Sequence, residues 1–480
     1  MEIQKLTVLH TNDIHSRFER MPKIAYWLKQ QRQDITDQQL LVIDCGDHID
    51  RVRMETEGTE GLANIYVMNE AGYDYAVPGN NEGLTIEPER LLELYKEHAR
   101  FKVLAANMYR GSSLPEPLLP FDIVHKGNIR VGLIGVTVDF TSFYELLGWD
   151  IQDPIATVQR TVEHMKPKAD VIILVSHLGI AHDQRIAEHI AGIDVIIGGH
   201  THHLLMQGEK VGTTLLAGAG KFGEYTGRID LEVHVRTKEI THIQAQCFST
   251  DLWMNDDSTE KIIKEERAKA KRNLSRPVAE LSSALEIHWS KESPFGNLLA
   301  AGLRKWTGAQ IGLVNSGQIL HSLPPGQVTR QIMLEICPSP INPCKLQLAG
   351  KHIRQSLEQS LLPEMQQMPI KGYGFRGEIL GSLCIDGAVV EYDPSGRPGG
   401  KILKILLESE DGSYMELEDE QLVSVGTIDM FTFGAGYLSL KNDKHPLYYL
   451  PEFIRDVLAE QLREPSELER AKTERWIARK

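Results

Sequence analysis

The chain has 480 residues, more than one hydrophobic core usually serves, so we expect two domains. Hydrophobic residues make up 41% and charged residues 25%, and 40 glycines with 22 prolines are ordinary numbers, which excludes collagen-like and low-complexity chains. The net charge of −14 disfavours nucleic acid polymers and anionic membranes as partners, but not a small phosphorylated substrate beside a metal ion.

The start of the sequence lacks the features of a secretory signal. Its first apolar run, Leu6–His10, is short and strand-like, and no basic stretch with an apolar segment precedes it. No apolar run reaches the roughly 18 residues that a membrane helix needs. Five cysteines form an odd, sparse set without a CxxC pair, which disfavours a disulfide framework and a zinc ribbon. We therefore expect a cytoplasmic protein.

The first 250 residues alternate short β-branched runs with amphipathic helical stretches. The strand candidates are Leu6–His10, Leu40–Ile43, Tyr75–Val77, Lys102–Ala105, Arg130–Val136, Val171–Val175, Val195–Ile197 and Thr213–Leu216. The helix candidates are Met21–Arg32, Glu87–His98, Ile155–Met165 and Asp183–Ala191. This alternation is typical of an α/β domain with much parallel pairing, in which the polar ends of the strands gather at one edge of the sheet.

A strongly charged helical stretch from Ser258 to about Asn273 follows, which we interpret as a solvated connecting helix. The elements beyond it predict a second α/β domain; they are a helix at Ser293–Trp306, a strand at Gln310–Val314, a strand and helix within Leu346–Leu361, strands within Ala388–Met415, and a last helix from about Pro451. We place the two domains at residues 1–255 and 275–480, with the connecting helix at 256–274.

Potential metal ligands directly follow five of the predicted strands. They lie in Thr11–His15, Asp44–Asp47, Pro78–Glu82, Ser176–Gly179 and Gly198–His203. Each segment alone is a weak signal, because a histidine after a strand is more often hydrogen-bonded than ligating, and Gly-Asp is usually a turn. Five such segments in one domain, all carrying Asp, His or Asn, indicate a metal site.

The residue types fit a pair of metal ions about 3.5–4 Å apart, which needs a bridging carboxylate with imidazoles and oxygens around each ion. Imidazole together with carboxylate suits Mn, Zn, Co or Fe. An asparagine adds a neutral oxygen, which keeps the charge of the site low enough to accept a phosphate. Two divalent metal ions would clamp a phosphoryl centre and lower the pKa of a bridging water. The pattern therefore favours phosphoester hydrolysis.

This order of motifs resembles the calcineurin-like metallophosphoesterases, and more narrowly the 5′-nucleotidase family (the 5′-nucleotidase / 2′,3′-cyclic phosphodiesterase type), including a bacterial cytoplasmic member. The resemblance covers residues 5–235 with specific motifs and continues more loosely beyond them. It implies an α/β protein with a four-layer αββα metallophosphoesterase domain, followed by an α/β 5′-nucleotidase-type C-terminal domain that binds the substrate. Carried over by position, Asp13, His15, Asp47 and His202 would hold one metal, and Asp47, Asn80, His177 and His200 the other, with Asp47 bridging.

The third block departs from the family pattern. The family has a His–Asp dyad there, whereas this sequence has Asn81 and Leu84. Asn81 would orient a phosphate oxygen by a hydrogen bond, but it cannot carry a proton, and general acid–base assistance is typically worth about 10²–10⁴-fold. Glu82 is an open alternative for the missing proton carrier. The change favours a slower enzyme or a substrate with a better leaving group.

Two segments of the second domain resemble polar substrate-binding blocks of the family. Arg304 falls near a substrate-binding arginine in the helix that starts near Ser293. Asn315 and Gly317 lie in a segment similar to a strand-end block, with Leu320 where an arginine is usual. A turn role for Asn315 and a solvent-exposed helix charge for Arg304 are the structural alternatives.

A third segment resembles the family's aromatic block and implies that Phe431, Phe433 and Tyr437 bind the substrate. Ala435 stands where an acidic ribose-binding residue is expected, and Ser339 where a base-stacking aromatic is expected. Stacking of a base is worth about 1–3 kcal/mol per ring. Simple packing beneath a loop is an equally good interpretation of the three aromatics.

These observations predict a metal-dependent phosphoester hydrolase that acts on nucleotides, with a small phosphorylated substrate as its partner. Nucleotide-sugar or cyclic-nucleotide phosphodiesters are the alternative substrates, since their leaving groups need less protonation. A metal-containing nucleotide-binding sensor with little turnover is the alternative outside enzymes. The sequence leaves the metal, the base and sugar, and the oligomeric state open.

Overall fold

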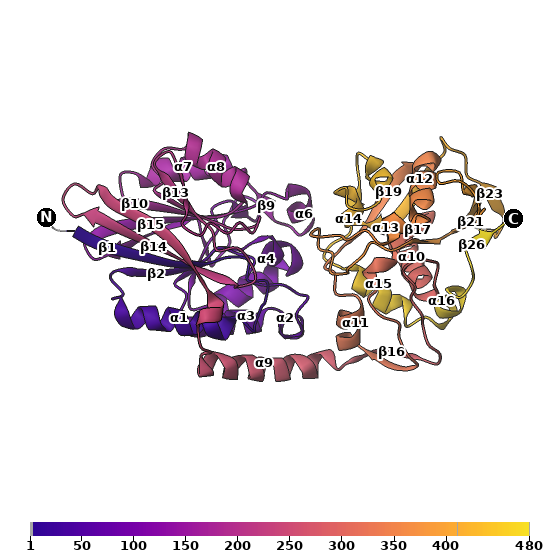
Figure 1. Ribbon diagram of the computed structural model, residues 1–480, viewed down its shortest axis with the longest axis horizontal. Helices are drawn as coiled ribbons and strands as arrows, with labels where there is room; N and C mark the ends of the chain where they lie inside the picture. The colour runs from indigo at the N-terminus through magenta and orange to yellow at the C-terminus, as the bar shows by residue number, and fades with distance from the viewer. Residues whose placement is uncertain (1–2, 410, 480) are drawn as a thin grey trace. The chain divides into compact units, whose positions relative to one another are not determined.

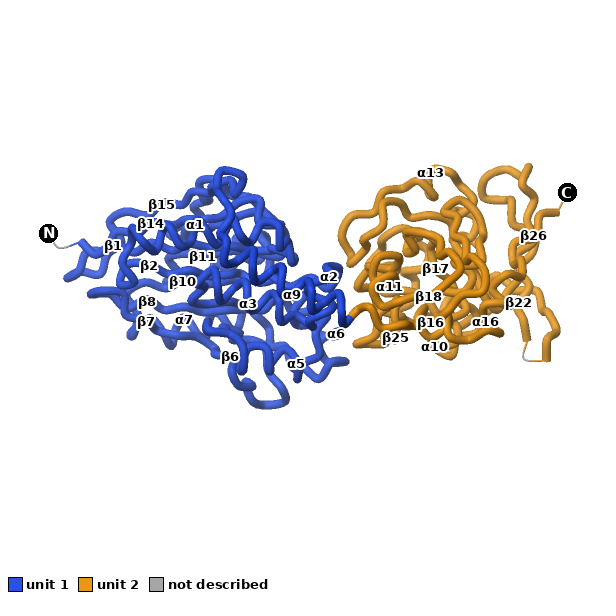
Figure 2. Tube along the Cα trace, turned by 90° about the horizontal axis from the view of Figure 1, so that it is seen from below, with its two compact units in different colours: residues 1–273 blue, residues 274–480 orange. Residues whose placement is uncertain are grey.

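The computed structural model describes residues 3–409 and 411–479 (Figure 1). The chain divides into two compact units, Met1–Asn273 and Leu274–Lys480 (Figure 2). The predicted connecting helix is α9 (Asp257–Leu274). Its contacts lie with the first unit, because Arg267 pairs with Glu55 and Asn273 Nδ2 donates to the carbonyl of Gly58 (2.8 Å). A side chain at Gly58 would meet the backbone of Ala270, so the glycine permits this close approach.

The first unit contains two large, mostly parallel sheets. One has the order β15-β14-β1-β2-β3-β4-β6 and comprises β1 (Ile3–Thr11), β2 (Leu40–Asp44), β3 (Tyr75–Ala76), β4 (Lys102–Leu104), β6 (Leu118–Leu119), β14 (Tyr225–His234) and β15 (Ile240–Ser249). The other has the order β12-β13-β11-β10-β8-β7 and comprises β7 (Phe121–Lys126), β8 (Ile129–Thr137), β10 (Val171–His177), β11 (Val195–Gly198), β12 (Glu209–Val211) and β13 (Thr214–Ala217). A short pair, β5 (Met108–Tyr109) and β9 (Asp150–Ile151), lies apart from them.

The two-residue alternation of the strands separates three apolar layers. Val8 and Ile43 share one buried cluster with Ile173 of the opposite sheet, so this cluster lies between the sheets. Alternate residues of the same strands face helices: Leu9 and Val42 join the cluster under α1 (Met21–Asp34) and α3 (Leu62–Ala71), and Leu174 joins the cluster under α7 (Pro154–Met165) and α8 (Ile180–His189). Figure 1 shows these helices on opposite sides of the paired sheets. The four-layer αββα arrangement is confirmed.

The shorter helices of the first unit lie near the carboxyl ends of its strands or follow them. They are α2 (Met54–Thr59), α4 (Asn80–Thr85), α5 (Pro88–Glu93) and α6 (Thr141–Leu146). The single helix predicted at Glu87–His98 is α5 followed by a π-helical turn, Leu94–His98. The amide of Ala99 donates to the carbonyl of Leu94 (3.1 Å), which widens this last turn.

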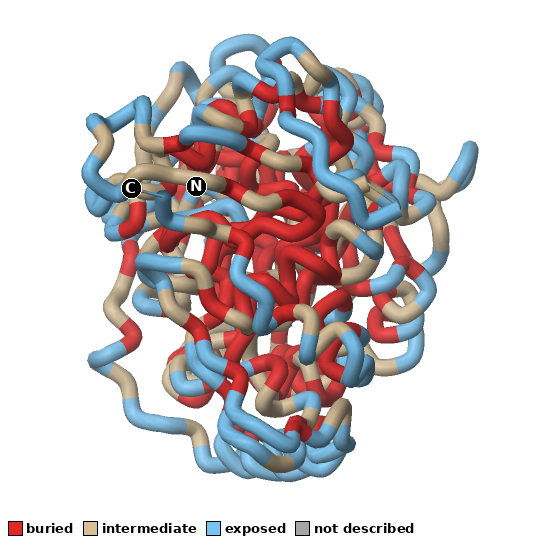
Figure 3. The backbone as a smooth tube through the Cα atoms, turned by 90° about the vertical axis from the view of Figure 1, so that its right-hand side faces the viewer, coloured by how far each residue is buried: buried red, intermediate tan, exposed pale blue. Residues whose placement is uncertain are grey.

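The second unit is a mixed α/β domain. Its five-stranded sheet has the order β20-β17-β24-β19-β25 and comprises β17 (Ile311–Asn315), β19 (Pro343–Ala349), β20 (Leu383–Asp386), β24 (Leu422–Ile428) and β25 (Leu447–Tyr448). Smaller sheets comprise β16 (Pro277–Leu281), β18 (Gly326–Thr329), β21 (Ala388–Tyr392), β22 (Ile402–Glu408), β23 (Tyr414–Glu416) and β26 (Trp476–Ala478). The helices are α10 (Pro294–Thr307), α11 (Arg330–Ile336), α12 (Gly350–Ser360), α13 (Pro363–Gln366), α14 (Asp429–Thr432), α15 (Ile454–Gln461) and α16 (Pro465–Arg470). In Figure 3 the buried segments form the interior and the exposed segments the outer loops.

The five cysteines are free thiols, and all of them are buried. Among the described residues, no helix combines the length and the apolar character that crossing a membrane requires.

A buried ion cluster ties the second unit together around Asp386, at the end of β20. Its carboxylate accepts hydrogen bonds from Arg470 (2.8 Å) and Arg475 (2.7 Å), and Arg304 lies 3.3 Å away. Burial alone raises the pKa of Asp386, but the Arg475, Arg470 and Arg304 guanidinium groups outweigh it and hold that pKa below its ordinary value. Arg304 also pairs with Glu408 (3.2 Å), so its charge is already engaged within the unit.

We expect Asp386→Asn to lower the free energy of unfolding of the second unit by about 3 kcal/mol, because it leaves the buried guanidinium group of Arg475 without its carboxylate. The wild-type contribution is present above the unfolded-state pKa, near 4, and is lost as the pH falls through the lower folded-state pKa. Urea unfolding at pH 7 and at pH 3 checks both statements. The control is Asp419→Asn, an exposed partner of Arg354, with an expected cost under about 1 kcal/mol. Equal effects of the two variants would contradict the assigned role of Asp386.

Candidate metal centre

The seven predicted ligands lie just beyond the carboxyl ends of β1, β2, β3, β10 and β11, with His177 as the last residue of β10. These strands are parallel within each sheet, so their ends meet at one edge. The backbone φ angle is positive at five of the seven: Asp13 (52°), His15 (48°), Asp47 (51°), His200 (71°) and His202 (59°). Left-handed conformations cost a side-chain-bearing residue about 1–3 kcal/mol and cluster at functional sites. The rest of the fold therefore stabilises strained turns, and these turns place the side chains at the edge of the sheets.

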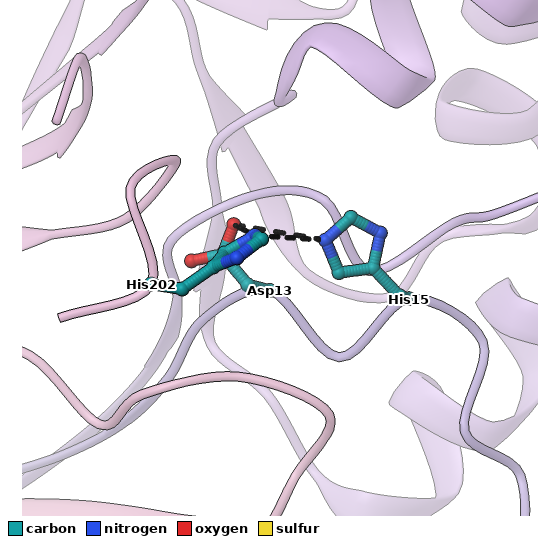
Figure 4. A group of neighbouring side chains, drawn as sticks. All are labelled: Asp13, His15 and His202. Atoms are coloured by element: carbon teal, nitrogen blue, oxygen red, sulfur yellow. Dashed lines mark hydrogen bonds and ion pairs between the residues drawn. The ribbon is translucent and has the colours of Figure 1, made fainter. Parts of the chain in front are cut away.

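One group consists of Asp13, His15 and His202 (Figure 4). The Nε2 atoms of the two histidines are 3.2 Å apart. Asp13 Oδ1 lies 3.5 Å from His202 Nε2 and 4.0 Å from His15 Nε2. Asp47 Oδ2 lies 3.8 Å from His15 Nε2, so Asp47 completes the four positions predicted for one metal.

The second group lies around Asn80. Its Oδ1 atom is 2.8 Å from His200 Nδ1 and 3.3 Å from His177 Nε2. His177 Nε2 is also 3.4 Å from Asp47 Oδ1. The two carboxylate oxygens of Asp47 thus face different groups, and this side chain links them as a bridging ligand would.

The donor set fits divalent cations. Asp13, Asp47, His15 and His177 are buried, and their lone-pair atoms converge within a few ångströms of one another. Hydrogen bonds do not remove the repulsion between acceptor atoms that converge in this way, whereas one cation attracts several of these atoms at once. Carboxylate, imidazole and amide oxygen together suit Mn, Zn, Co or Fe.

The electrostatics of the chain favour the cation-binding protonation state of three of these groups, Asp47, His200 and His202. Burial lowers the pKa of His200 and of His202 to about 4, so both imidazoles are neutral at pH 7. Burial would raise the pKa of Asp47, but His177 and His15 outweigh it and hold this pKa below its ordinary value. In the absence of a cation Asp47 correspondingly raises the pKa of His177 to about 10 against the effect of burial.

The surrounding backbone fixes the orientation of the ligands. The Nδ1 atom of His177 donates to the carbonyl of Cys45 (2.7 Å), which directs Nε2 toward Asp47. Glu82 is buried, and its carboxylate accepts from the amides of Asp47 (3.0 Å), Ile49 (2.7 Å) and Gly79 (2.8 Å). Glu82 therefore holds the turns that carry Asp47 and Asn80, and these three amides occupy its oxygens.

Asn81 lies against His15, one of the predicted ligands. Its Nδ2 atom is 2.9 Å from His15 Nδ1 and donates to the carbonyl of Ile49 (3.1 Å), while its backbone amide donates to Asp47 Oδ1 (2.8 Å). Asp50 Oδ2 lies 3.3 Å from the same Nδ1 atom of His15. A role of Asn81 in orienting a phosphate stays a prediction, and Asp50 is a positioning residue for His15 that sequence reasoning missed. An aspartate three residues after a ligand aspartate was the available signal.

The six predicted substrate residues of the second unit divide into buried and accessible ones. Asn315 donates through Nδ2 to the carbonyl of Leu380 (2.6 Å), and the amide of Gly317 donates to the same carbonyl (3.1 Å). Phe431 and Tyr437 are buried and pack edge-to-face, with their ring centroids 5.9 Å apart, and the Tyr437 hydroxyl donates to the carbonyl of Gly381 (2.7 Å). Arg304 lies in the Asp386 cluster. Phe433 is 42% exposed. Roles of all six in substrate binding stay predictions.

Phe433 stacks on an aromatic residue that the motif comparison missed. The Tyr373 ring lies nearly parallel to it, with an interplanar angle of 16° and a centroid distance of 6.4 Å. Tyr373 is 51% exposed and has a positive φ of 54° between Gly372 and Gly374. A glycine on each side of an aromatic residue was the only sequence signal for this exposed turn.

Comparisons with known proteins agree with the two units. The calcineurin-like phosphoesterase family matches residues 6–204, and the family described as 5′-nucleotidase, C-terminal domain, matches residues 274–436. The uncharacterised metallophosphoesterase YunD of Bacillus subtilis is 37% identical, over 96% of this chain and 99% of that protein. The human 5′-nucleotidase is 25% identical, over 84% of this chain and 78% of that protein. The structure of the NAD nucleotidase of Haemophilus influenzae covers 100% of both chains, with a TM-score of 0.69 and 18% identity, and shows the fold.

We expect two divalent ions per chain and a higher melting temperature with Mn²⁺ than after chelation, because a cation that binds only the folded chain stabilises it by about 2.7 kcal/mol at 100 times its dissociation constant. Asp47→Ala should reduce the bound metal to less than one ion per chain, since it faces both groups. Metal content after equilibrium dialysis and thermal unfolding check this. Asp37→Ala, at an exposed carboxylate, is the control and should bind as the wild type does. Two ions retained by Asp47→Ala would contradict the bridging role.

Proposed function

The chain belongs to the calcineurin-like metallophosphoesterases that carry a 5′-nucleotidase C-terminal domain, and we propose that it hydrolyses the phosphoester bond of nucleotides at a two-metal centre. Its family members are phosphoester hydrolases, and the chain is one by this membership. The observation that carries the two-metal assignment is Asp47, whose two carboxylate oxygens face the two ligand groups.

Seven side chains would hold the metals. Asp13, His15, Asp47 and His202 form one set and Asp47, Asn80, His177 and His200 the other. When bound, a pair of divalent ions provides an activated water and neutralises the charge of a phosphate. Glu82 and Asp50 would keep the ligands in place, and Asn81 would orient a phosphate oxygen.

We assign recognition of the rest of the substrate to the second unit. Phe433, with Tyr373 beside it, offers accessible ring surface for a planar base, which supports its predicted role. The burial of Phe431 and Tyr437 supports a packing role for both, with Phe433 as the contacting residue. A cytoplasmic location belongs to this proposal, and the five free thiols support it.

A second candidate function follows from Asn81. An amide cannot protonate a departing alkoxide, so esters with better leaving groups would suit this centre more than a nucleoside monophosphate does. Cyclic nucleotides and nucleotide sugars are such substrates. A metal-containing sensor with little turnover remains the outcome if no phosphoester is cleaved.

We expect phosphate release from a nucleoside monophosphate in Mn²⁺, and a gain in kcat/KM of about tenfold or more in the double variant Asn81→His with Leu84→Asp. This variant restores a proton-carrying dyad at the two positions where the family has one. Phosphate release measured over a series of substrate concentrations checks it, with Asp47→Ala as the inactive reference. Metal content must be equal in the double variant and the wild type, because Asn81 also contacts His15. Absence of turnover on monophosphates, cyclic nucleotides and nucleotide sugars, with two metals bound, would exclude the hydrolase and leave the sensor.

A further inference from the structure

The second unit contains a pocket that is separate from the contacts assigned to the substrate. Its volume is about 400 Å³, within the range of about 300–1,000 Å³ that is usual for small-molecule sites. Its lining comes from the segment before α10 and the first turn of that helix, from the start of β20, from β21, and from the end of the chain next to β26 (Figure 1). The six predicted substrate residues, all of them described, lie outside this lining.

Three buried residues of the lining carry a side-chain oxygen that has no hydrogen-bond partner among the described residues. They are Ser293 and Asn297, each 2% exposed, and Ser382, which is 5% exposed. The unpartnered atoms are the two serine hydroxyls and Oδ1 of Asn297. Buried polar atoms are paired in the large majority of cases, because an unpaired one loses the hydrogen bonds that it makes in water. Three such atoms around one pocket therefore point to a ligand that pairs with them.

Hydrogen bonds within the chain fix the orientation of Asn297. Its Nδ2 atom donates to Glu292 Oε1 (2.8 Å) and to the carbonyl of Ala471 (3.2 Å), which leaves Oδ1 as an acceptor. Glu292 also accepts from the amides of Arg475 (2.7 Å) and Trp476 (3.0 Å), and these bonds join the end of the chain to the start of α10. The protein itself thus orders the pocket, so a ligand binds without the entropic cost of ordering it.

Part of the lining is aromatic and apolar. The rings of Tyr392 and Trp476 meet edge-to-face with their centroids 5.8 Å apart, and Leu361 and Leu383 belong to the same lining. Nε1 of Trp476 is a fourth buried atom without a partner among the described residues, and an indole N–H can only donate. A matching ligand accepts from this N–H, donates to Oδ1 of Asn297, and presents an apolar face to the rings.

The formal charges of the lysines and glutamates in the lining cancel. Lys291 and Lys472 are matched by Glu292 and Glu474, and Glu469 lies 2.6 Å from Lys472. The carboxylate of Glu292 is occupied by the hydrogen bonds that hold the end of the chain. The unpartnered atoms of the lining are all uncharged. Because burying an ion without a partner is costly, a neutral ligand fits this pocket better than an anion or a cation does.

We propose that this pocket binds a neutral polyhydroxylated molecule of the size of a nucleoside or a monosaccharide. Its hydroxyl groups donate to Asn297 Oδ1, accept from Trp476 Nε1, and pair with the hydroxyls of Ser293 and Ser382, which both donate and accept. The ribose of a nucleoside and a free sugar share this chemistry, and the experiment distinguishes them. The inference does not rest on the proposed function, because the lining contains none of the seven predicted metal ligands, all of which are described.

Ligand-observed NMR titration of the full chain with D-ribose, D-glucose and adenosine tests the proposal. We expect a dissociation constant below about 1 mM for the probe that binds most tightly. Ser382→Ala should weaken this binding about fivefold or more, since it removes one hydrogen bond. Thr473→Trp, which places a ring at an exposed position of the lining, should abolish it. The matched control is Ser439→Ala, which removes a buried, unpartnered hydroxyl outside the lining and should bind as the wild type does.

The order of the affinities identifies the ligand. Tighter binding of adenosine than of D-ribose would assign the pocket to a nucleoside, and tighter binding of D-glucose than of the other two probes would assign it to a free sugar. Absence of binding of all three probes would overturn the proposal, and so would binding that neither Ser382→Ala nor Thr473→Trp weakens. Adenosine binding that is lost only in Phe433→Ala would belong to the Phe433–Tyr373 pair and would also overturn it.

Thermal unfolding without a probe gives an independent readout. Ser382→Ala should melt within about 2 °C of the wild type, as Ser439→Ala should, because the hydroxyl that each removes has no partner among the described residues. A much lower melting temperature of Ser382→Ala alone would show that its hydroxyl already contributes to the stability of the fold, and would overturn its assignment to a ligand.

Discussion

The main constraint on the first unit is that its fold holds hydrogen-bond acceptor atoms of several side chains facing one another. The carboxylates of Asp13 and Asp47 meet the imidazoles of His15, His177 and His202 at distances of 3.4 to 4.0 Å, as in the Asp47–His177 and Asp13–His15 pairs. Left to themselves these groups repel or compete for protons. The fold opposes that tendency with left-handed turns after the strands and with backbone amides on Glu82. The stability of the two sheets thus keeps close together side chains that would separate in solution.

Much of the fold and of this centre could be predicted from the sequence. Hydrophobic runs of strand length alternate with helical periodicity, and parallel strands bring their carboxyl ends to one edge, so that Asp13, Asp47 and His177 had to converge. The predicted helix at Glu87–His98 ends in a wider turn, closed by the hydrogen bond from the amide of Ala99 to the carbonyl of Leu94. The sequence did not predict this turn because that hydrogen bond carries no sequence signal. The sequence leaves Glu82 open as a proton carrier, but its carboxylate accepts hydrogen bonds from the amides of Asp47 and Ile49, more than 30 residues earlier in the chain, and no local pattern reveals these two contacts.

The second unit shows where such reasoning ends. Phe431, Phe433 and Tyr437 lie in one short segment, yet two of them are buried and one is accessible, because the chain turns at Gly434 and Gly436. Arg304 is flanked by a regular amphipathic helix pattern, and its partners Asp386 and Glu408 are more than 80 residues away in the sequence. Tertiary contacts determine which distant residues form ion pairs and which aromatic ring of a segment is exposed. Motif similarity can place such residues in a segment but cannot say which way they face.

The close contact between α9 and the first unit also bears on how this chain could be recombined. Ile263 is part of the apolar cluster under α1 and α3, and Gly58 has no side chain where the helix backbone passes. The helix therefore covers part of the apolar core of the first unit, in addition to connecting the two units. A chimaera that takes its second half from another protein would have to join after Asn273. A junction at residue 255 would remove α9 from the first unit and expose the apolar surface that this helix covers. Such a chimaera would therefore have a destabilised first unit.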